Sequence, residues 1–277
     1  MNPIDVARRL RAVTERMDAS HPGKGETRLS IAGAWVTVNP ASDSPIVSRN
    51  RNRVQYFGCT QHVEPGDLDA ALEPFVQARI PRCYFWLSPC PQVTAIQLWL
   101  AERRFVPFTG IPPWPAPDYH TLAYAPGRGL LHGLESGIAR ETSLVVRSPS
   151  RAEAERHVAD LADIHAAFGG DDIFLASLGR AGFSHFLAFD GARPVAAAIL
   201  VAHGGMAYLG HAATAEAYRR RGGQSALIAA RLRRAVELGC HCAVSETLSI
   251  LGSSLGNLKR QGFEVLYDKK IFMRSAT

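Results

Sequence analysis

Residues 218–227 read Tyr218-Arg219-Arg220-Arg221-Gly222-Gly223-Gln224-Ser225-Ala226-Leu227 and lie between a predicted strand, Met206–Thr214, and a predicted helix, Ile228–Leu238. A glycine-containing loop at a helix N-terminus directs backbone N–H groups and the positive end of the helix dipole at one point. Flanking arginines add bidentate, charge-assisted hydrogen bonds to phosphate oxygens. The stretch therefore predicts a site for a small phosphate-bearing ligand.

The sequence around this loop predicts strands and helices in alternation. Ser150 is a predicted helix N-cap with Glu153 as its capping-box partner, and Asp190-Gly191 is a predicted tight turn between two strands. The predicted strands are Ser143–Arg147, His185–Phe189, Pro194–Ala202, Met206–Thr214 and Cys240–Thr247, and the predicted helix after Ser150 is Arg151–Phe168.

The order strand, Arg-x-x-Gly-x-x loop, helix, strand and short helix ending in Gly-Phe resembles the GNAT superfamily of acetyl-CoA-dependent N-acetyltransferases. The family signature, Gln/Arg-x-x-Gly-x-Gly/Ala, maps onto Arg219, Gly222 and Gln224, and Gln224 departs from it at the third position. A second supporting motif runs from Asn257 to Gly262-Phe263. The resemblance covers roughly residues 143–274.

The resemblance implies acetyl-CoA (coenzyme A) as the cofactor and assigns its contacts by position. The backbone of Ala212, Ala213 and Thr214 would bind the pantetheine arm, and Asn257 would contact the same arm. The pyrophosphate would be wrapped by Arg219, Arg220, Arg221, Gly222, Gly223 and Gln224, with Ser225 at the helix start.

Transfer of an acetyl group to an amine needs a base, because a lysine-like amine is protonated at neutral pH. Glu246, at the end of a predicted strand, is the first candidate and His211 is the second; the alternatives are an ion-pair partner and an interior histidine. Many relatives place a tyrosine acid four residues before the helix-ending glycine, where this chain has Leu258. Tyr208 and Tyr267 are the replacement candidates.

The N-terminal half resembles a degenerate copy of the C-terminal half. Tyr84 aligns with Cys242 and Phe105 with Phe263, and both pairs are 158 residues apart. At this offset Glu64, Pro65 and Gly66 replace the phosphate-loop residues, so the first copy is not expected to bind CoA. We therefore predict an α/β (α+β) chain of two GNAT-like domains, each a mixed, mostly antiparallel sheet flanked by helices: residues 1–125, a linker at 126–141, and a catalytic domain at 142–277.

Composition and charge limit the other classes of function. Residues 1–140 carry 15 basic and 12 acidic side chains and residues 141–277 carry 16 and 13, so each half has a net charge of +3. This even distribution disfavours nucleic-acid binding, which needs a concentrated basic surface. No apolar run is long enough for a membrane span or signal peptide, which makes a cytoplasmic protein the expectation. Cys240-His241-Cys242 has poor chelate geometry on a strand, so no metal site is predicted.

The leading hypothesis is an N-acetyltransferase that acts on an amine of a small molecule or peptide. Two alternatives stay open: a tandem GNAT protein that transfers an aminoacyl group, and a non-catalytic acyl-CoA-binding regulatory module. The first is disfavoured because such relatives have usually lost the CoA loop, whereas this chain retains it at Arg219–Gln224. The second stays open because Leu258 replaces the usual tyrosine and Gln224 replaces the usual glycine. The acceptor amine and the oligomeric state have no signature in the sequence.

Overall fold

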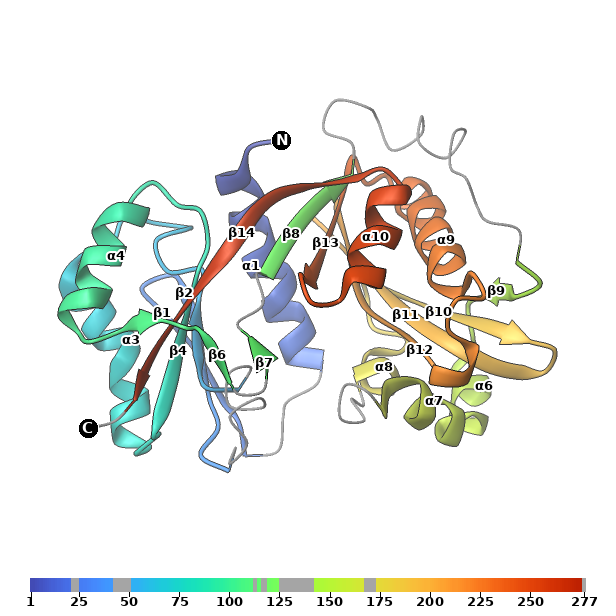
Figure 1. The fold of residues 1–277 in the computed structure, drawn as a ribbon, viewed down its shortest axis with the longest axis horizontal. Coiled ribbons are helices and arrows are strands. Elements are labelled where there is room, and N and C mark those ends of the chain that lie inside the picture. Colours follow the sequence, from blue (N-terminus) through green and yellow to red (C-terminus); the bar gives the residue numbers. More distant parts are fainter. Residues whose placement is uncertain are drawn as a thin grey trace. The chain divides into compact units, whose positions relative to one another are not determined.

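The computed structural model describes residues 1–20, 25–41, 51–111, 114–115, 119–124, 142–166 and 173–275, and the predicted linker at 126–141 lies outside these ranges (Figure 1). The chain forms two compact units. Unit 1 consists of Met1–Glu15, Pro22–His120 and Tyr267–Thr277, and unit 2 of Arg16–His21 and Thr121–Leu266. Strands β8 (Tyr119–Tyr124) and β14 (Phe263–Ser275) and helix α1 (Pro3–Ser20) each contribute residues to both units.

Unit 1 is built on a mixed sheet with the strand order β1-β2-β3-β4-β14. Only β3 and β4 pair in parallel; β1 with β2, β2 with β3, and β4 with β14 are antiparallel. Its elements are α1 (Pro3–Ser20), β1 (Thr27–Ile31), β2 (Ala34–Val38), β3 (Arg53–Gln55), α3 (Pro65–Gln77), β4 (Arg82–Leu87), α4 (Val93–Glu102), β5 (Val106–Pro107), β6 (Gly110–Ile111) and β7 (Trp114–Pro115).

Unit 2 repeats this plan with the strand order β14-β8-β13-β12-β11-β10-β9. Strands β12 and β13 pair in parallel and are joined by α9, whereas β9 to β12 are antiparallel. Its elements are β9 (Val145–Arg147), α6 (Arg151–Arg156), α7 (Val158–His165), α8 (Ile173–Ser177), β10 (Phe183–Asp190), β11 (Arg193–His203), β12 (Met206–Thr214), η2 (Glu216–Tyr218), α9 (Gly223–Glu237), β13 (Cys242–Leu248) and α10 (Gly252–Arg260).

The core of unit 2 lies on both sides of β11. Residues 194–201 of this strand are all buried, and both α7 and α9 pack against it. The alanines at 196–198 are fully buried in this strand, where small side chains allow close helix packing. A strand covered on both faces reads as a continuous apolar run, which is the pattern of Val195–Val201.

Several predicted elements are confirmed, and two helices differ. Strand Met206–Thr214 has the predicted bounds, and the Ser150 hydroxyl accepts a hydrogen bond from the backbone N–H of Glu153 at 3.2 Å. The single helix predicted from Arg151 is instead broken at His157, whose backbone is not helical (φ −109°, ψ 26°). Helix α9 begins at Gly223 instead of Ile228, so the predicted loop itself supplies the first helical turn.

Unit 2 contains a buried histidine whose titration couples to folding. His185 on β10 is 4% exposed, and its Nε2 lies 2.8 Å from the buried hydroxyl of Ser177. The ring of Phe174 packs edge-on at 4.9 Å. Burial, followed by the charge of Arg151, lowers the pKa of His185 from 6.5 to about 4.

This shift predicts a loss of stability in acid. Above pH 6.5 the imidazole is neutral in the folded and unfolded chains, whereas between pH 6.5 and about 4 only the unfolded chain binds the proton. We expect the free energy of unfolding to fall across this window by up to about 3 kcal/mol more in the wild type than in His185→Gln, measured by urea denaturation. His241→Gln, at an exposed position, is the control; equal pH slopes for His185→Gln and the wild type would contradict the prediction.

Candidate active site

The loop that precedes α9 has a backbone shaped to leave donors exposed. Gly222 is the N-cap of α9 with φ +84°, and no side chain caps this helix end. Arg220 also has a positive φ of 66°. The positive φ favours glycine here, and a Cβ atom at this position would make a tight contact of 3.1 Å with Thr142 Cβ. Because the first N–H groups of a helix have no intrahelical acceptor, this turn can bind an anion.

The three arginines of the loop differ in how they are held. Arg221 forms an ion pair with Asp190 at 2.9 Å, and its guanidinium lies 5.2 Å from the Tyr218 ring centroid. Arg219 is 4.0 Å from Glu216, while Arg220 has no ion-pair partner within the described part of the chain. All three side chains are exposed. An incoming phosphate could therefore exchange with weak surface pairs at little cost.

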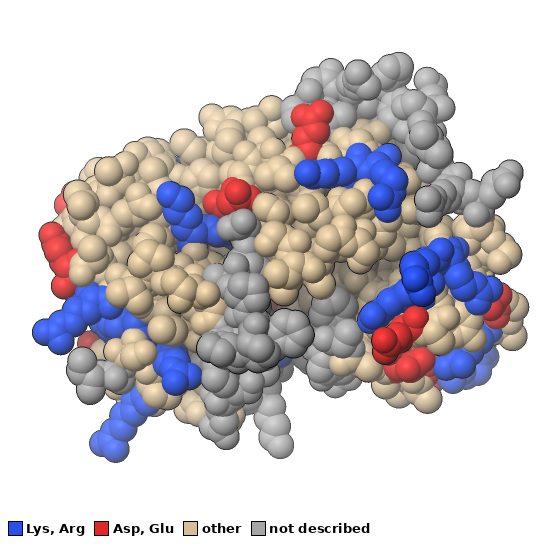
Figure 2. All heavy atoms as spheres, viewed as in Figure 1, with Lys and Arg blue, Asp and Glu red and all other residues tan. Residues whose placement is uncertain are grey.

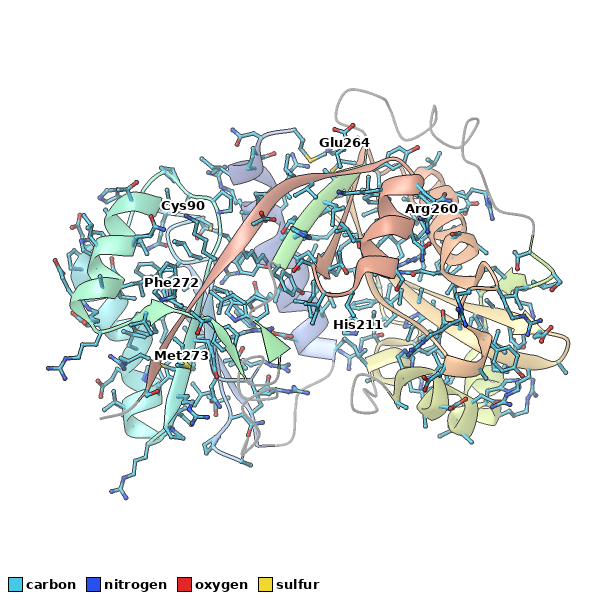
Figure 3. All side chains as sticks on the ribbon, in the orientation of Figure 1. Cys90, His211, Arg260, Glu264, Phe272 and Met273 are labelled. Atoms are coloured by element: carbon cyan, nitrogen blue, oxygen red, sulfur yellow. The ribbon has the colours of Figure 1, made fainter. Side chains whose placement is uncertain are left out.

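Gln224, which occupies the position of a family glycine or alanine, is bonded to α10. Its amide nitrogen donates to Ser254 Oγ at 3.1 Å, and its amide oxygen accepts a short hydrogen bond from Asn257 Nδ2. Asn257 in turn accepts a hydrogen bond from Arg260, which is labelled on α10 in Figure 3. The side chain thus ties the start of α9 to α10. Asn257, a predicted cofactor contact, is already engaged at both ends of its amide.

Strand β12 is irregular at the residues predicted to bind the cofactor arm. Its register with β11 shifts between the pairs Ile199–Gly210 and Ala197–Ala213, which inserts one extra residue into β12. His211 in this bulge has φ +44° and is half-buried (Figure 3). His211, Ala212, Ala213 and Thr214 therefore all lie in or beyond the bulge.

Residues His211–Thr214 of β12 lie beyond the last residue pair that joins β12 to β13. The parallel ladder runs from Met206–Cys242 to Tyr208–Val244, whereas β12 continues to Thr214 and β13 to Leu248. The Ser245 hydroxyl donates to the carbonyl of Leu209 at 2.8 Å, just after the last pair. Backbone groups of a strand that has left its neighbour need other partners. The separation of β12 from β13 thus offers a place for an extended ligand.

A buried arginine lies beneath the bulge. Arg231 on α9 is 1% exposed, and its Nη1 donates to the carbonyls of Ile199 at 3.4 Å and Gly210 at 3.3 Å. Its Nε donates to Leu227 at 3.1 Å. Burial lowers the pKa of the guanidinium to about 9, so it is still charged at neutral pH. The arginine therefore joins both strands of the irregular pair to α9.

Glu246, the first-ranked candidate base, is held by two hydroxyl groups. Its Oε1 accepts a hydrogen bond from Thr121 Oγ1 at 3.0 Å, and the hydroxyl of Tyr208 lies 3.5 Å from Oε2. Thr121 is fully buried and Glu246 is half-buried. The Tyr208 ring lies over Gly210, where an added Cβ would come within 2.5 Å of the ring. Glycine at 210 is thus what lets Tyr208 reach Glu246.

The other candidate residues have different environments. Leu258, at the family's usual tyrosine position, is 3% exposed and belongs to the apolar core of unit 2. Tyr208 is in unit 2 with Glu246, whereas Tyr267 belongs to unit 1. Ser225 is buried in the first turn of α9. Cys240 and Cys242 are buried free thiols and His241 is exposed.

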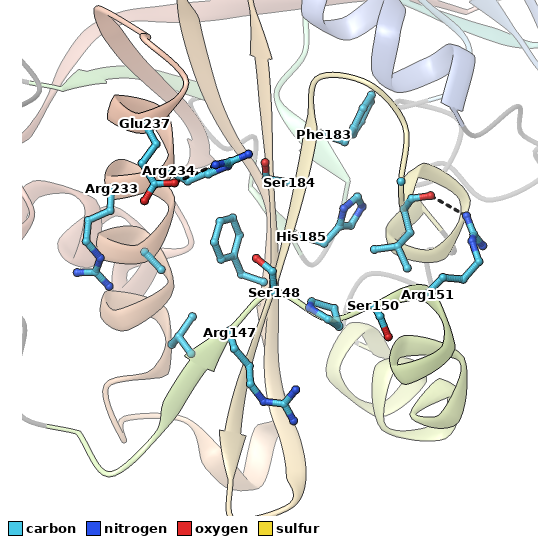
Figure 4. A pocket seen from close by; sticks show the side chains of 16 residues that line it. Arg147, Ser148, Ser150, Arg151, Phe183, Ser184, His185, Arg233, Arg234 and Glu237 are labelled. Atoms are coloured by element: carbon cyan, nitrogen blue, oxygen red, sulfur yellow. Dashed lines mark hydrogen bonds and ion pairs between the residues drawn. The ribbon is translucent and has the colours of Figure 1, made fainter.

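A separate cavity of about 640 Å³ lies toward the other end of α9 (Figure 4). Its arginines point in different directions, and three of them have partners: Arg147 pairs with Glu153, Arg151 donates to Leu178 O at 2.6 Å, and Arg234 pairs with Glu237 at 2.9 Å. On the face shown in Figure 2, basic side chains also lie among acidic ones. This cavity contains none of the predicted site residues.

The corresponding helix start in unit 1 is chemically different. Glu64 is the N-cap of α3, exactly one repeat of 158 residues before Gly222, and Pro65 is the first helical residue. The Glu64 N–H donates to the carboxylate of Asp67 at 2.8 Å. Two carboxylates and a residue without an N–H therefore occupy the position that would have to bind phosphate.

Among solved structures, those with a similar fold include bacterial acetyltransferases. A GCN5-related N-acetyltransferase from Kribbella flavida matches with a TM-score of 0.63 and 15% identity over 98% of this chain and 96% of that chain. A tandem GNAT protein from the clavulanic acid biosynthesis pathway matches with a TM-score of 0.62 and 10% identity over 99% of this chain and 94% of that chain. A GCN5-related N-acetyltransferase from Sphaerobacter thermophilus matches with a TM-score of 0.58 and 13% identity over 98% of this chain and 91% of that chain.

At these identities the likeness is one of fold. It extends over nearly the whole chain and confirms the predicted fold class of two GNAT-like domains. No protein-family model and no curated protein sequence matches the chain. No helix of the described ranges has the length and apolar character needed to cross a bilayer.

The contacts of Arg231 predict a specific loss of order in the bulge. Arg231→Met removes both hydrogen bonds to the strand carbonyls but keeps the bulk of the side chain, and it removes a buried charge. We expect the amides of 210–213 to exchange at least about tenfold faster, while amides of β10 are unchanged, by hydrogen exchange. Arg233→Met, at an exposed position on the same helix, is the control; unchanged exchange in Arg231→Met would show that the guanidinium does not hold the bulge.

Proposed function

We propose that this protein is an acetyl-CoA-dependent N-acetyltransferase whose catalytic site lies in unit 2. The observation that carries the proposal is the start of α9: a left-handed glycine cap without a capping side chain, flanked by three arginines. The loop follows β12 directly, at the end where β12 has left β13. One continuous stretch, from His211 to Ser225, thus combines an extended backbone with an anion site.

The residues present fit coenzyme A. No side chain caps the first N–H groups of α9 at Gly222, and Arg219, Arg220 and Arg221 supply cations for a pyrophosphate. The side chain of Gln224 is bonded to Ser254 and Asn257, so it does not need to cross the phosphate position. Backbone groups of Ala212, Ala213 and Thr214 would bind the pantetheine arm. Asn257 would join them by exchanging one of its present hydrogen bonds.

When bound, acetyl-CoA would supply an acetyl thioester as the acyl donor, with CoA thiol as the leaving group. Glu246 would take the proton that the nitrogen loses, because its carboxylate is oriented by Thr121 and Tyr208 and is only half-buried. Tyr208 would donate a proton to the leaving group, in the role that Leu258 cannot fill. His211, in the strained bulge, is the second candidate base.

The acceptor would be an amine of a small molecule or peptide. A thiol-release assay with acetyl-CoA and a mixed panel of amines tests the activity directly. Saturable CoA binding without turnover on any amine would favour the regulatory alternative, a non-catalytic acyl-CoA-binding module. Absence of CoA binding by calorimetry would overturn the proposal as a whole.

Charge reversal at the loop should remove CoA binding. Arg219→Glu with Arg221→Glu replaces two cations next to the helix start with anions, which repel the pyrophosphate. We expect CoA affinity to fall at least about 100-fold by calorimetry, with the thermal midpoint close to that of the wild type because both side chains are exposed. The control has the same change in charge at exposed sites elsewhere, Arg156→Glu with Arg233→Glu. Retained affinity in the loop variant would show that the loop is not the phosphate site.

Removal of the base should affect turnover and spare the cofactor. Glu246→Gln keeps the size of the side chain and its hydrogen bond from Thr121 but cannot accept a proton. We expect kcat to fall roughly 10²–10⁴-fold, as for other general bases, with CoA affinity within about twofold of the wild type. Glu264→Gln, at an exposed position of unit 2, is the control. An unchanged kcat for Glu246→Gln would remove this carboxylate from the mechanism.

A further inference from the structure

Strand β10 is covered on its outer side over only part of its length. In the strand order of unit 2, β9 is the last strand and β10 lies next to it. Strand β9 pairs with residues 187–189 of β10, whereas β10 begins at Phe183. Within the described ranges, no strand lies beside residues 183–186 on the side away from β11. An uncovered strand edge is a template for pairing with another chain.

A proline explains why β9 ends where it does. The last residue of β9, Arg147, pairs with Leu187, so the same register would place Pro149 opposite His185. Proline has no N–H group and cannot continue the hydrogen-bond ladder. The chain instead turns into helix α6. The sequence thus ends β9 before it can cover the first residues of β10.

Backbone groups of β10 face outward along this open edge. The Ala202 N–H donates to the Gly182 carbonyl at 2.8 Å, so residues 182, 184 and 186 direct their N–H and C=O groups toward β11. The alternate residues, Phe183 and His185, direct theirs away from β11. The Phe183 N–H is already bonded within the preceding turn. The outward groups that a neighbouring strand could pair with are therefore the N–H and C=O of His185 and the C=O of Phe183.

The cavity of about 640 Å³ lies along this open edge (Figure 4). Residues 183–186 all line it, with α9 on one side and the Leu178–Gly179 turn and the start of α6 on the other. An added strand needs about 3.4 Å of length per residue and about 4.8 Å of width, between layers about 10 Å apart. The cavity therefore has room for about four extended residues, which matches the uncovered length of β10.

Arginines border the open edge on both sides. Arg233 and Arg234 come from α9 and Arg151 from the start of α6, on opposite sides of β10 in Figure 4. Arg233 forms no ion pair with the described residues. The Arg234–Glu237 pair is exposed, so an incoming carboxylate could replace Glu237 at little cost. Because four arginines and only one carboxylate line the cavity, its charge favours an anionic ligand.

We propose that the open edge of β10 binds an extended acidic segment of a partner protein, which adds to the sheet as a strand. The backbone of the segment would pair with Phe183 and His185. Successive side chains of a strand point to opposite faces, so acidic residues of the segment would meet Arg233 and Arg234 on one face and Arg151 on the other. A cationic segment would be repelled by the same arginines.

The proposed docking edge is separate from the proposed cofactor site. Arg234 follows Gly222 by 12 residues in the sequence, which corresponds to about 18 Å along α9. The cavity contains no residue of the phosphate loop. Binding of the acidic segment can therefore be tested without acetyl-CoA and without any assay of turnover.

Peptide binding tests the proposal directly. The probe is a fluorescein-labelled hexapeptide of alternating valine and glutamate, followed by fluorescence anisotropy at low salt. We expect a Kd of about 100 μM or tighter. The same peptide with lysine in place of glutamate, and a fully N-methylated acidic peptide, should each bind at least about tenfold more weakly. Equal binding of the N-methylated peptide would show attraction by charge alone and would overturn strand addition, as would absence of binding of the acidic peptide.

Variants locate the peptide on the cavity. Arg233→Glu with Arg234→Glu should weaken binding at least about tenfold, because two cations beside the edge become anions. The control has the same change in charge at exposed sites of unit 1, Arg79→Glu with Arg82→Glu, and should bind within about twofold of the wild type. Retained affinity in the α9 variant would overturn the assignment of the site. Wild-type exchange rates of the β11 amides establish that each variant is folded.

Hydrogen exchange distinguishes strand addition from surface attraction. Saturating acidic peptide should slow exchange of the His185 amide at least about tenfold, because its outward N–H gains an acceptor. The amide of Leu187, a residue that already pairs with β9, should change less than about twofold. Unchanged exchange at His185 with the peptide bound would show that the peptide does not pair with β10, and the proposal would fail.

Discussion

The hydrogen bonds from Arg231 to the carbonyls of Ile199 and Gly210 connect the features on which the candidate site depends. The arginine is on α9, about 12 Å along the helix from the N–H groups at its start. One helix thus carries both the turn that is proposed to bind phosphate and the arginine that contacts the bulge in β12. A charged group so deeply buried must be compensated by hydrogen bonds, and these carbonyls provide them. Moving α9 would therefore disturb both ends of the proposed cofactor site together.

The bulge has a second consequence for chemistry. It lies just beyond the last residue of β12 that pairs with β13, and that residue is Tyr208. The Tyr208 ring can lie over Gly210 because residue 210 has no side chain, and the Tyr208 hydroxyl then approaches Glu246. The same local irregularity thus ends the pairing of β12 with β13 and places the Tyr208 hydroxyl near the Glu246 carboxylate, the proposed acid and base. The bulge in β12 thus brings the unpaired part of this strand close to the Tyr208–Glu246 contact.

Sequence reasoning identified the loop and most strands because their signals are local. A strand end, a glycine cap and arginines are adjacent in the chain, and the spacing of the repeats needs no tertiary information. The burial of Arg231 has no local signal in the sequence, because Arg233 and Arg234 follow closely in the same helix and are exposed. Only the packing of α9 against β11 and β12 distinguishes Arg231 from them. The start of α9 was placed too late because two glycines usually disfavour helix. Thr121, which orients Glu246, is 125 residues away in the sequence.

The two helix starts show how a duplicated fold can diverge in ligand chemistry while keeping its geometry. Gly222 and Glu64 are N-caps at the same offset, so the backbone plan has been kept in both units. In unit 1 the cap carries its own carboxylates, which satisfy the donors from within the protein. In unit 2 the cap has no side chain, so the donors are left to water or to the proposed ligand. A helix N-terminus needs an acceptor in either case, and the identity of one residue decides whether the protein or a ligand provides it.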